Sequence, residues 1–185
     1  MTRLLGISGS LRKGSFNTAL LRAASEMLPA ETTLDVRTLH GIPLYDGDLE
    51  LSSGIPPAVT VLKEAFAAAD GVLLATPEYN NGIPGVFKNG IDWLSRPPAD
   101  AARLFGGKPV ALIGASPGGF GTILAQNAWL AVLRTLGTRP WFGGRLMASR
   151  AGSLFDDAGV LKDPATRKQL QDYLLGFVEF VRSGR

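Results

Sequence analysis

Short apolar runs alternate along the whole chain with segments whose apolar residues recur at helical spacing. Runs such as "GVLLAT" and "PVALIGA" are apolar at nearly every position, which is typical of parallel strands covered on both faces of a sheet. We therefore expect an α/β fold with a doubly wound, five-stranded parallel sheet. The expected strands are residues 4–8, 34–39, 71–76, 109–115 and 145–148, and the expected helices are residues 16–28, 57–69, 85–94, 121–136 and 164–182.

The size of the chain fits one domain, residues 1–185. Its 185 residues, 45% of them hydrophobic, are enough to build a single sizeable core. The stretch from Ser95 to Lys108 is expected to be a surface loop and not a linker between domains. Five strands fit a flavodoxin-like order, 2-1-3-4-5, or half of a dinucleotide-binding fold, and both bind ligands beyond the carboxyl ends of the strands. The site should therefore lie in the loops at residues 8–18, 76–85 and 115–121.

The rarity of two residue types excludes several kinds of chemistry. Cysteine is absent, so disulfides, thiolate zinc sites and cysteine nucleophiles are excluded. His40 is the single histidine; we expect no metal site and assign this side chain no role. Scattered cations and a net charge of +3 favour a small anionic ligand over a nucleic acid. No apolar stretch approaches the roughly 18 residues of a membrane span, so we expect a cytoplasmic protein without a membrane partner.

The first loop, "GSLRKGSFN" at residues 9–17, leaves an expected strand and enters an expected helix. Such a turn presents free N–H groups and the positive end of the helix dipole, which stabilise an anion. It lacks the lysine of the ATPase phosphate loop and the glycine spacing of the dinucleotide loop. A single phosphate monoester such as that of FMN is the remaining interpretation, and a simple helix cap is the alternative. The side chains that would serve the phosphate are Ser10, Arg12, Ser15, Asn17 and Thr18.

Proline and glycine dominate the second loop, "TPEYNNGIPG". They fix a tight path and let the backbone approach a flat ligand, although an ordinary turn is the alternative. The third loop contains "GASPG", residues 114–118, which matches the G-x-S-x-G elbow of serine hydrolases with Ser116 as the nucleophile. That mechanism needs a base, and His40 precedes Ser116 in the chain instead of following it. A hydrolase therefore stays a competing hypothesis.

The motifs "GSLRKGSFN", "TPEYNNGIPGVFKNGIDWLSRP" and "GASPGGFG" together resemble the NADPH-dependent FMN reductase family, particularly its quinone, chromate and azo-dye reductase branch. The segment "IPLYDGDLE", residues 42–50, also resembles that branch. The resemblance implies a flavodoxin-like fold and an FMN-dependent oxidoreductase. Such an enzyme takes a hydride from NADPH or NADH onto flavin N5 and passes electrons to quinone-like, azo, chromate or flavin acceptors in ping-pong order, without a catalytic side chain.

The resemblance also assigns expected flavin contacts. The second loop would line the ring, with Gly82 permitting close approach, while the third loop would receive the ribityl chain or ring edge and stabilise negative charge there. Relatives often carry Ser or a second Tyr where this chain has Asn81 and Gly82. The expected cofactor-binding residues are Ser10, Leu11, Arg12, Ser15, Phe16, Asn17, Thr18, Pro77, Glu78, Tyr79, Asn80, Gly82, Ser116, Gly118 and Gly119.

The helix expected at residues 121–136 carries more apolar surface than one sheet face covers. The resemblance implies a two-fold homodimer that uses this region, with a dimer of dimers as a further assembly. Many relatives place Arg and Tyr at the positions of Leu124 and Asn127, so polar contacts of that kind between dimers are not carried over. A non-enzymatic flavodoxin-like electron carrier or FMN-binding protein is the alternative function, because it would have the same fold.

Overall fold

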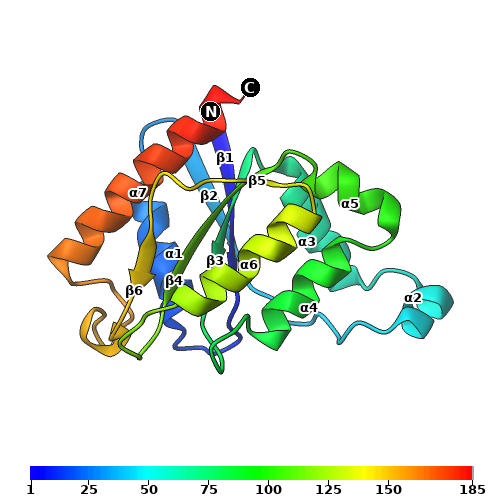
Figure 1. Cartoon of the computed structure of the whole chain (residues 1–185), viewed down its shortest axis with the longest axis horizontal. Helices are drawn as coiled ribbons and strands as arrows, with labels where there is room; N and C mark the ends of the chain where they lie inside the picture. Colours follow the sequence, from blue (N-terminus) through cyan, green and yellow to red (C-terminus); the bar gives the residue numbers. More distant parts are fainter. Residues whose placement is uncertain (185) are drawn as a thin grey trace.

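The computed structural model describes residues 1–184 and confirms the doubly wound, flavodoxin-like α/β architecture (Figure 1). The parallel sheet has the order β2-β1-β3-β4-β5, and β6 also pairs with β4. The strands are β1 (Thr2–Ser8), β2 (Thr32–Arg37), β3 (Gly71–Ala75), β4 (Pro109–Ala115), β5 (Arg139–Pro140) and β6 (Leu146–Ala148). The helices are α1 (Phe16–Glu26), α2 (Gly47–Ser53), α3 (Pro57–Ala68), α4 (Gly85–Leu94), α5 (Pro98–Phe105), α6 (Ile123–Thr135), the 3-10 turn η1 (Ala151–Ser153) and α7 (Pro164–Ser183).

Helices cover both faces of the sheet, so the molecule has two hydrophobic cores. α1 and α7 pack on one face, and α3, α4, α5 and α6 pack on the other. Neighbouring strand residues alternate between them: Leu4 and Leu73 belong to the first core, whereas Leu5 and Leu74 belong to the second. Neither face meets water, which explains why these strands are apolar throughout. Figure 1 shows the loops after β1, β3 and β4 gathered at the end of the sheet opposite the chain termini.

The fifth strand position is occupied by two short strands. β5 pairs with the start of β4, and β6 pairs with its end. Between them, residues 141–145 stand opposite only Ala111 and Leu112 of β4, so the extra residues bulge out of the ladder. Pro140 also weakens pairing there, because proline has no N–H to donate. The strand expected at residues 145–148 is confirmed as β6, and β5 is an addition to it.

The expectation of a surface loop from Ser95 to Lys108 is wrong, because this stretch contains α5. Pro97 and Pro98 suggested a loop, yet proline is well suited to the start of a helix, where N–H groups have no intrahelical partner. Leu104 and Phe105 are buried at the other end of the helix and join the second core. Burial of this apolar end outweighs the local turn signal.

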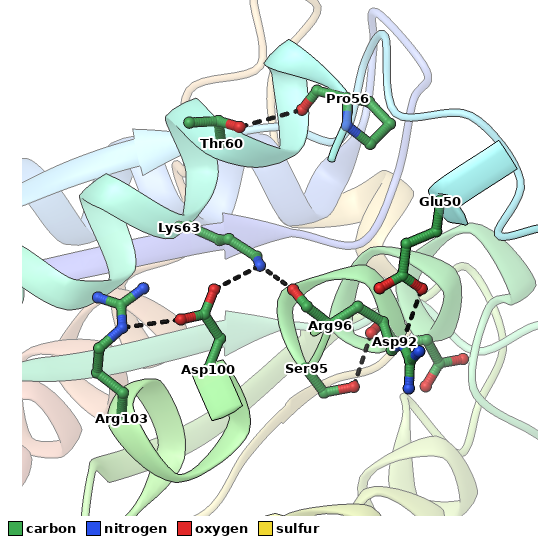
Figure 2. Close-up of polar contacts among 9 residues, drawn as sticks. All are labelled: Glu50, Pro56, Thr60, Lys63, Asp92, Ser95, Arg96, Asp100 and Arg103. Atoms are coloured by element: carbon green, nitrogen blue, oxygen red, sulfur yellow. Dashed lines mark hydrogen bonds and ion pairs between the residues drawn. The ribbon is translucent and has the colours of Figure 1, made fainter. Parts of the chain in front are cut away.

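α2 was also not expected from the sequence, and none of its residues is buried. Asp46 caps its first turn by accepting a hydrogen bond from the Asp48 N–H, with 2.9 Å between the two atoms. Glu50 joins the helix to the residues that follow α4, because its Oε2 accepts a hydrogen bond of 2.8 Å from Arg96 Nε (Figure 2). The Tyr45 hydroxyl donates a second hydrogen bond to the same carboxylate oxygen. The hydrogen bond from Arg96 lowers the pKa of Glu50 below its ordinary value. A short surface helix is thus held by polar contacts in place of a core.

A buried lysine connects α3 to α5. The Lys63 side chain is only 7% exposed, and its ammonium donates to the Arg96 carbonyl and to Asp100 Oδ2, the latter at 2.8 Å (Figure 2). Asp100 also accepts from Arg103 Nε at 2.9 Å. These hydrogen bonds, first that of Arg103 and then that of Lys63, lower the pKa of the Asp100 carboxyl. A charge this deeply buried needs its partner to remain stable.

Asp100→Ala should therefore lower the free energy of unfolding by about 3 kcal/mol, because it leaves the Lys63 ammonium buried without a carboxylate. Arg103→Ala is the matched control: its side chain is 55% exposed, and its loss should cost less than about 1 kcal/mol. Urea denaturation of the two variants and the parent measures both values. Equal losses would contradict the special role given to the buried pair.

Candidate functional site

The three loops that the sequence singled out meet in one cavity of about 90 Å³ at the carboxyl edge of the sheet. This convergence follows from the topology, because β1, β3 and β4 are neighbours and parallel. Leu11, Thr18, Asn80, Gly82, Gly118 and Gly119 belong to the same loops but are not part of the cavity wall. The wall is formed by Ser10, Arg12, Ser15, Phe16, Asn17, Pro77, Glu78, Tyr79, Ala115, Ser116 and Pro117.

Hydroxyl groups and two cations, Arg12 and Lys13, characterise the first loop. Ser15 caps α1, as its side chain accepts a hydrogen bond from the Thr18 N–H at 3.3 Å. Ser10 is buried and accepts from the Arg12 N–H at 3.3 Å. The Arg12 guanidinium is exposed and, among residues 1–184, donates a hydrogen bond to the Gly14 carbonyl alone, at 3.5 Å. This group of donors suits an anion, and the helix cap predicted as the alternative is present alongside it.

Two of the expected ligand residues in this loop hold the protein together instead. The buried Asn17 side chain donates to the Ala115 carbonyl and accepts from the Ala115 N–H, both at 2.9 Å. Thr18 shares a 2.8 Å hydrogen bond with Ser8 at the end of β1. Asn17 therefore fixes the start of α1 against the end of β4. Any role of these two side chains toward a cofactor stays a prediction.

The second loop is a tight hairpin turn. Tyr79 and Gly82 exchange backbone hydrogen bonds of 3.2 and 3.0 Å, and the two residues between them, Asn80 and Asn81, have φ of 48° and 61°. Asparagine tolerates this left-handed region better than most residues, and two in succession are typical of this class of turn. The backbone thus explains both asparagines. The turn leaves the Tyr79 ring 46% exposed beside the cavity.

Glu78 has a structural partner that sequence reasoning missed. Its Oε2 accepts hydrogen bonds from the N–H groups of Leu124 and Ala125, at 2.9 and 3.0 Å. These groups belong to the first turn of α6, where a carboxylate stabilises the positive end of the helix dipole. The cap residue of α6, Thr122, makes no side-chain capping bond. The first turn of α6 also has no acidic residue of its own, and this absence is the one sign in the sequence that a carboxylate from elsewhere could serve the helix. Glu78 consequently ties the second loop to the third.

The third loop offers no hydrolase chemistry. Ser116 Oγ accepts from the Gly118 N–H at 3.2 Å. The imidazole of His40, the single histidine, is hydrogen-bonded through one nitrogen to Thr38 and through the other to the Leu11 carbonyl. Ser116 thus has no imidazole base beside it, and the nucleophile-elbow pattern reflects a strand-to-helix turn alone.

Three glycines leave a bare strip on the second and third loops. A Cβ added at Gly82 or Gly118 would meet its nearest atom at 3.8 or 3.6 Å, and one at Gly119 would meet nothing within 4 Å. None of the three has a positive φ, so the fold itself does not require glycine there. By contrast, a Cβ at Gly9 would collide with the Phe87 ring. A strip without side chains fits a planar ring, and the donors of the first loop fit a phosphate; together they fit FMN.

A larger cavity of about 420 Å³ lies between α6, α7 and the interrupted fifth strand. Its wall contains Leu124, Leu130, Trp141 and Tyr173 but none of the residues expected to bind the cofactor. Cavity volume does not identify the site, because several surface hollows exceed the cavity of the three loops, whereas the convergence of polar loops does identify it. Separately, no helix within residues 1–184 is long and apolar enough to cross a membrane.

Comparison with known proteins gives a consistent result. Residues 2–152 match the family model of the NADPH-dependent FMN reductases. The chain is 43% identical to an NAD(P)H-dependent FMN reductase of Pseudomonas aeruginosa, over 97% of this chain and 95% of that protein. It is 35% identical to a quinone reductase of Escherichia coli strain K12, over 97% of this chain and 95% of that protein. The structure of FerB, a flavoenzyme NAD(P)H:(acceptor) oxidoreductase from Paracoccus denitrificans, superimposes with a TM-score of 0.85 at 32% identity. The superposition covers 99% of this chain and 98% of the FerB chain.

The family match covers all three loops of the cavity, and these relatives span nearly the full length of the chain. The fold, the donors of the first loop and the glycine strip are independent of that match and agree with it. The chain therefore belongs to the NADPH-dependent FMN reductase family and is an oxidoreductase with FMN as cofactor and NAD(P)H as co-substrate.

Proposed function

We propose that this oxidoreductase holds FMN across its three loops and passes electrons from NADPH or NADH to quinone-like acceptors, with azo dyes, chromate and free flavin as further acceptors. The observation that carries the proposal is the meeting of the three loops in one cavity, with hydroxyl-bearing residues of the first loop in its wall and glycines without side chains on the second and third loops that border it. Quinone reductases among the relatives support the acceptor class.

The residues divide the work of holding the cofactor. Ser10, Ser15 and Arg12 face the phosphate with hydroxyl, backbone and guanidinium donors. The turn at Tyr79 and the strip at Gly119 flank the ring, and backbone N–H groups that lead into α6 stabilise negative charge at its edge. When bound, FMN supplies the redox chemistry by accepting a hydride from NAD(P)H and delivering electrons to the acceptor. The protein orients and polarises the flavin ring, and no catalytic side chain is needed.

The mouth of the cavity is open and aromatic. The Tyr79 ring is 46% exposed and the Phe120 side chain is 85% exposed, each on a loop that borders the cavity. Flat molecules such as nicotinamide or a quinone stack well on such surfaces. A single open face accommodates them one after the other, which favours ping-pong kinetics.

The purified protein should be yellow, bleach when NADPH is added without oxygen, and recover its flavin absorbance when a quinone follows. Steady-state rates at several quinone concentrations should give parallel double-reciprocal plots against NADPH. An electron carrier would bind FMN but would not bleach with NAD(P)H unless a separate reductase were added. Well-folded protein that refuses added FMN would disprove the proposal.

Gly119→Ala tests the flavin-facing strip. The new Cβ meets nothing within the protein, so the free energy of unfolding should stay constant or rise by up to about 1 kcal/mol. If the ring lies against this residue, the FMN dissociation constant should rise roughly tenfold. Gly152→Ala is the matched control, because it also adds a Cβ in open space but lies in η1 outside the cavity. Equal FMN binding by both variants would place the ring elsewhere.

A homodimer is the assembly that the surface supports. In α6, Trp129 and Leu133 are buried against the sheet, yet further large apolar side chains remain exposed around them. We name these the α6 patch: Ile123, Leu124, Leu130 and Phe142, which all line the larger cavity. A contiguous apolar patch on one face marks a surface that a second copy covers, and a dimer of dimers would need another such face.

Leu124→Lys should shift the protein from dimer toward monomer in sedimentation, because it places a charge within the α6 patch. Leu175→Lys is the control: Leu175 is 42% exposed, close to the 44% of Leu124, but lies on α7 away from the patch. A parent protein that is monomeric at all concentrations, or equal behaviour of both variants, would refute this interface.

A further inference from the structure

His40 lies beyond the end of β2, yet it contacts the tip of the first loop. Its Nε2 is 3.1 Å from the Leu11 carbonyl oxygen, and its Nδ1 is 2.9 Å from Thr38 Oγ1. A carbonyl oxygen only accepts hydrogen bonds, so Nε2 must carry the proton of this contact. In the neutral ring the Thr38 hydroxyl then donates to Nδ1, which selects the tautomer that the Leu11 contact requires.

This contact is the main restraint on an otherwise loosely held segment. Residues 11–14 are exposed, so packing does not fix them. Their other hydrogen bonds stay within the loop, such as the bond from Ser15 N–H to the Arg12 carbonyl at 3.2 Å. In the described part of the chain, residues 10–14 have no other hydrogen bond to a residue outside the loop. His40 therefore decides the orientation of the loop tip.

The consequence passes through a single peptide plane. In a trans peptide, the C=O of one residue and the N–H of the next point in opposite directions. The Leu11 carbonyl points to His40, so the Arg12 N–H points the other way, where Ser10 Oγ receives it at 3.3 Å. Ser10 and Arg12 both line the cavity. A 3.3 Å bond to a hydroxyl is long, and a phosphate oxygen makes a stronger acceptor for the same N–H.

We propose that His40 is a positioning residue for the FMN phosphate: by holding the Leu11 carbonyl, it aims the Arg12 N–H at the phosphate site. The inference rests on the proposed function, because it assumes that the first loop receives the phosphate. It adds a residue from outside the three loops. Its effect is confined to the phosphate end of the cofactor and does not extend to the ring.

The test compares two ligands that differ only in the phosphate, FMN and riboflavin, by fluorescence titration of the full chain stripped of flavin. His40→Ala should raise the dissociation constant of FMN about fivefold, the usual effect of one hydrogen bond, and leave that of riboflavin unchanged. His40→Gln should restore most of the FMN affinity, because its amide N–H can donate to the same carbonyl. The unfolding midpoint should be the same in all three proteins.

Three results would overturn the inference: unchanged FMN affinity in His40→Ala, an equal loss for FMN and riboflavin, or no recovery in His40→Gln. The parent protein separates this failure from that of the proposed function. A parent that binds FMN more tightly than riboflavin keeps the proposed function in place whatever His40 does. A parent that binds neither flavin removes the proposed function and this inference with it.

Discussion

The pair of hydrogen bonds between Asn17 and Ala115 determines how the site is assembled. β4 runs on to Ala115, beyond the last residue of β3, which pairs with Ile113, so the Ala115 backbone lacks partners on that side and the Asn17 amide provides both a donor and an acceptor. Because both residues are buried, water does not compete for these bonds. The first loop is thereby held against the third at a fixed distance.

The site is a prearranged backbone surface more than a cluster of reactive side chains. Asn17, Thr18, Asn80 and Glu78 were all expected to meet a ligand, yet each has a clear task within the protein. Glu78 and Asn17 join the third loop to the second and the first, respectively. Such cross-links remove freedom from the loops before any ligand arrives, which lowers the entropy cost of binding. This design suits a reaction whose chemistry belongs to the cofactor.

The sequence predicted those parts of the fold that depend on local patterns. The apolar runs of β3 and β4 and the helical spacing of α4 agree with the structure within one residue. α5 was missed because burial of Leu104 and Phe105 competes with an adjacent proline pair, and only tertiary structure decides between them. The bulge at residues 141–145 depends on register with β4, which no local pattern encodes.

The candidate site shows the same division. The loops and most cavity residues followed from the strand order, but Glu78 reaches α6 and His40 reaches Leu11 across 46 and 29 residues of sequence. Contacts at such separations exist only once the chain has folded. Nothing in the sequence assigned His40 a role, because the side chain contributes a hydrogen bond to the Leu11 carbonyl and no reactive group. Side chains that orient backbone are the class that sequence reading alone overlooks.

The interrupted fifth strand has a consequence for how the molecule behaves in a crowded solution. An uninterrupted edge strand offers a row of unpaired backbone groups that a foreign chain can extend, which is a common route to aggregation. Here β5 has two residues and β6 has three, separated by a bulge that carries two glycines. No ladder of useful length is left on that side of the sheet. Addition of a foreign strand at this edge of the sheet is thus discouraged.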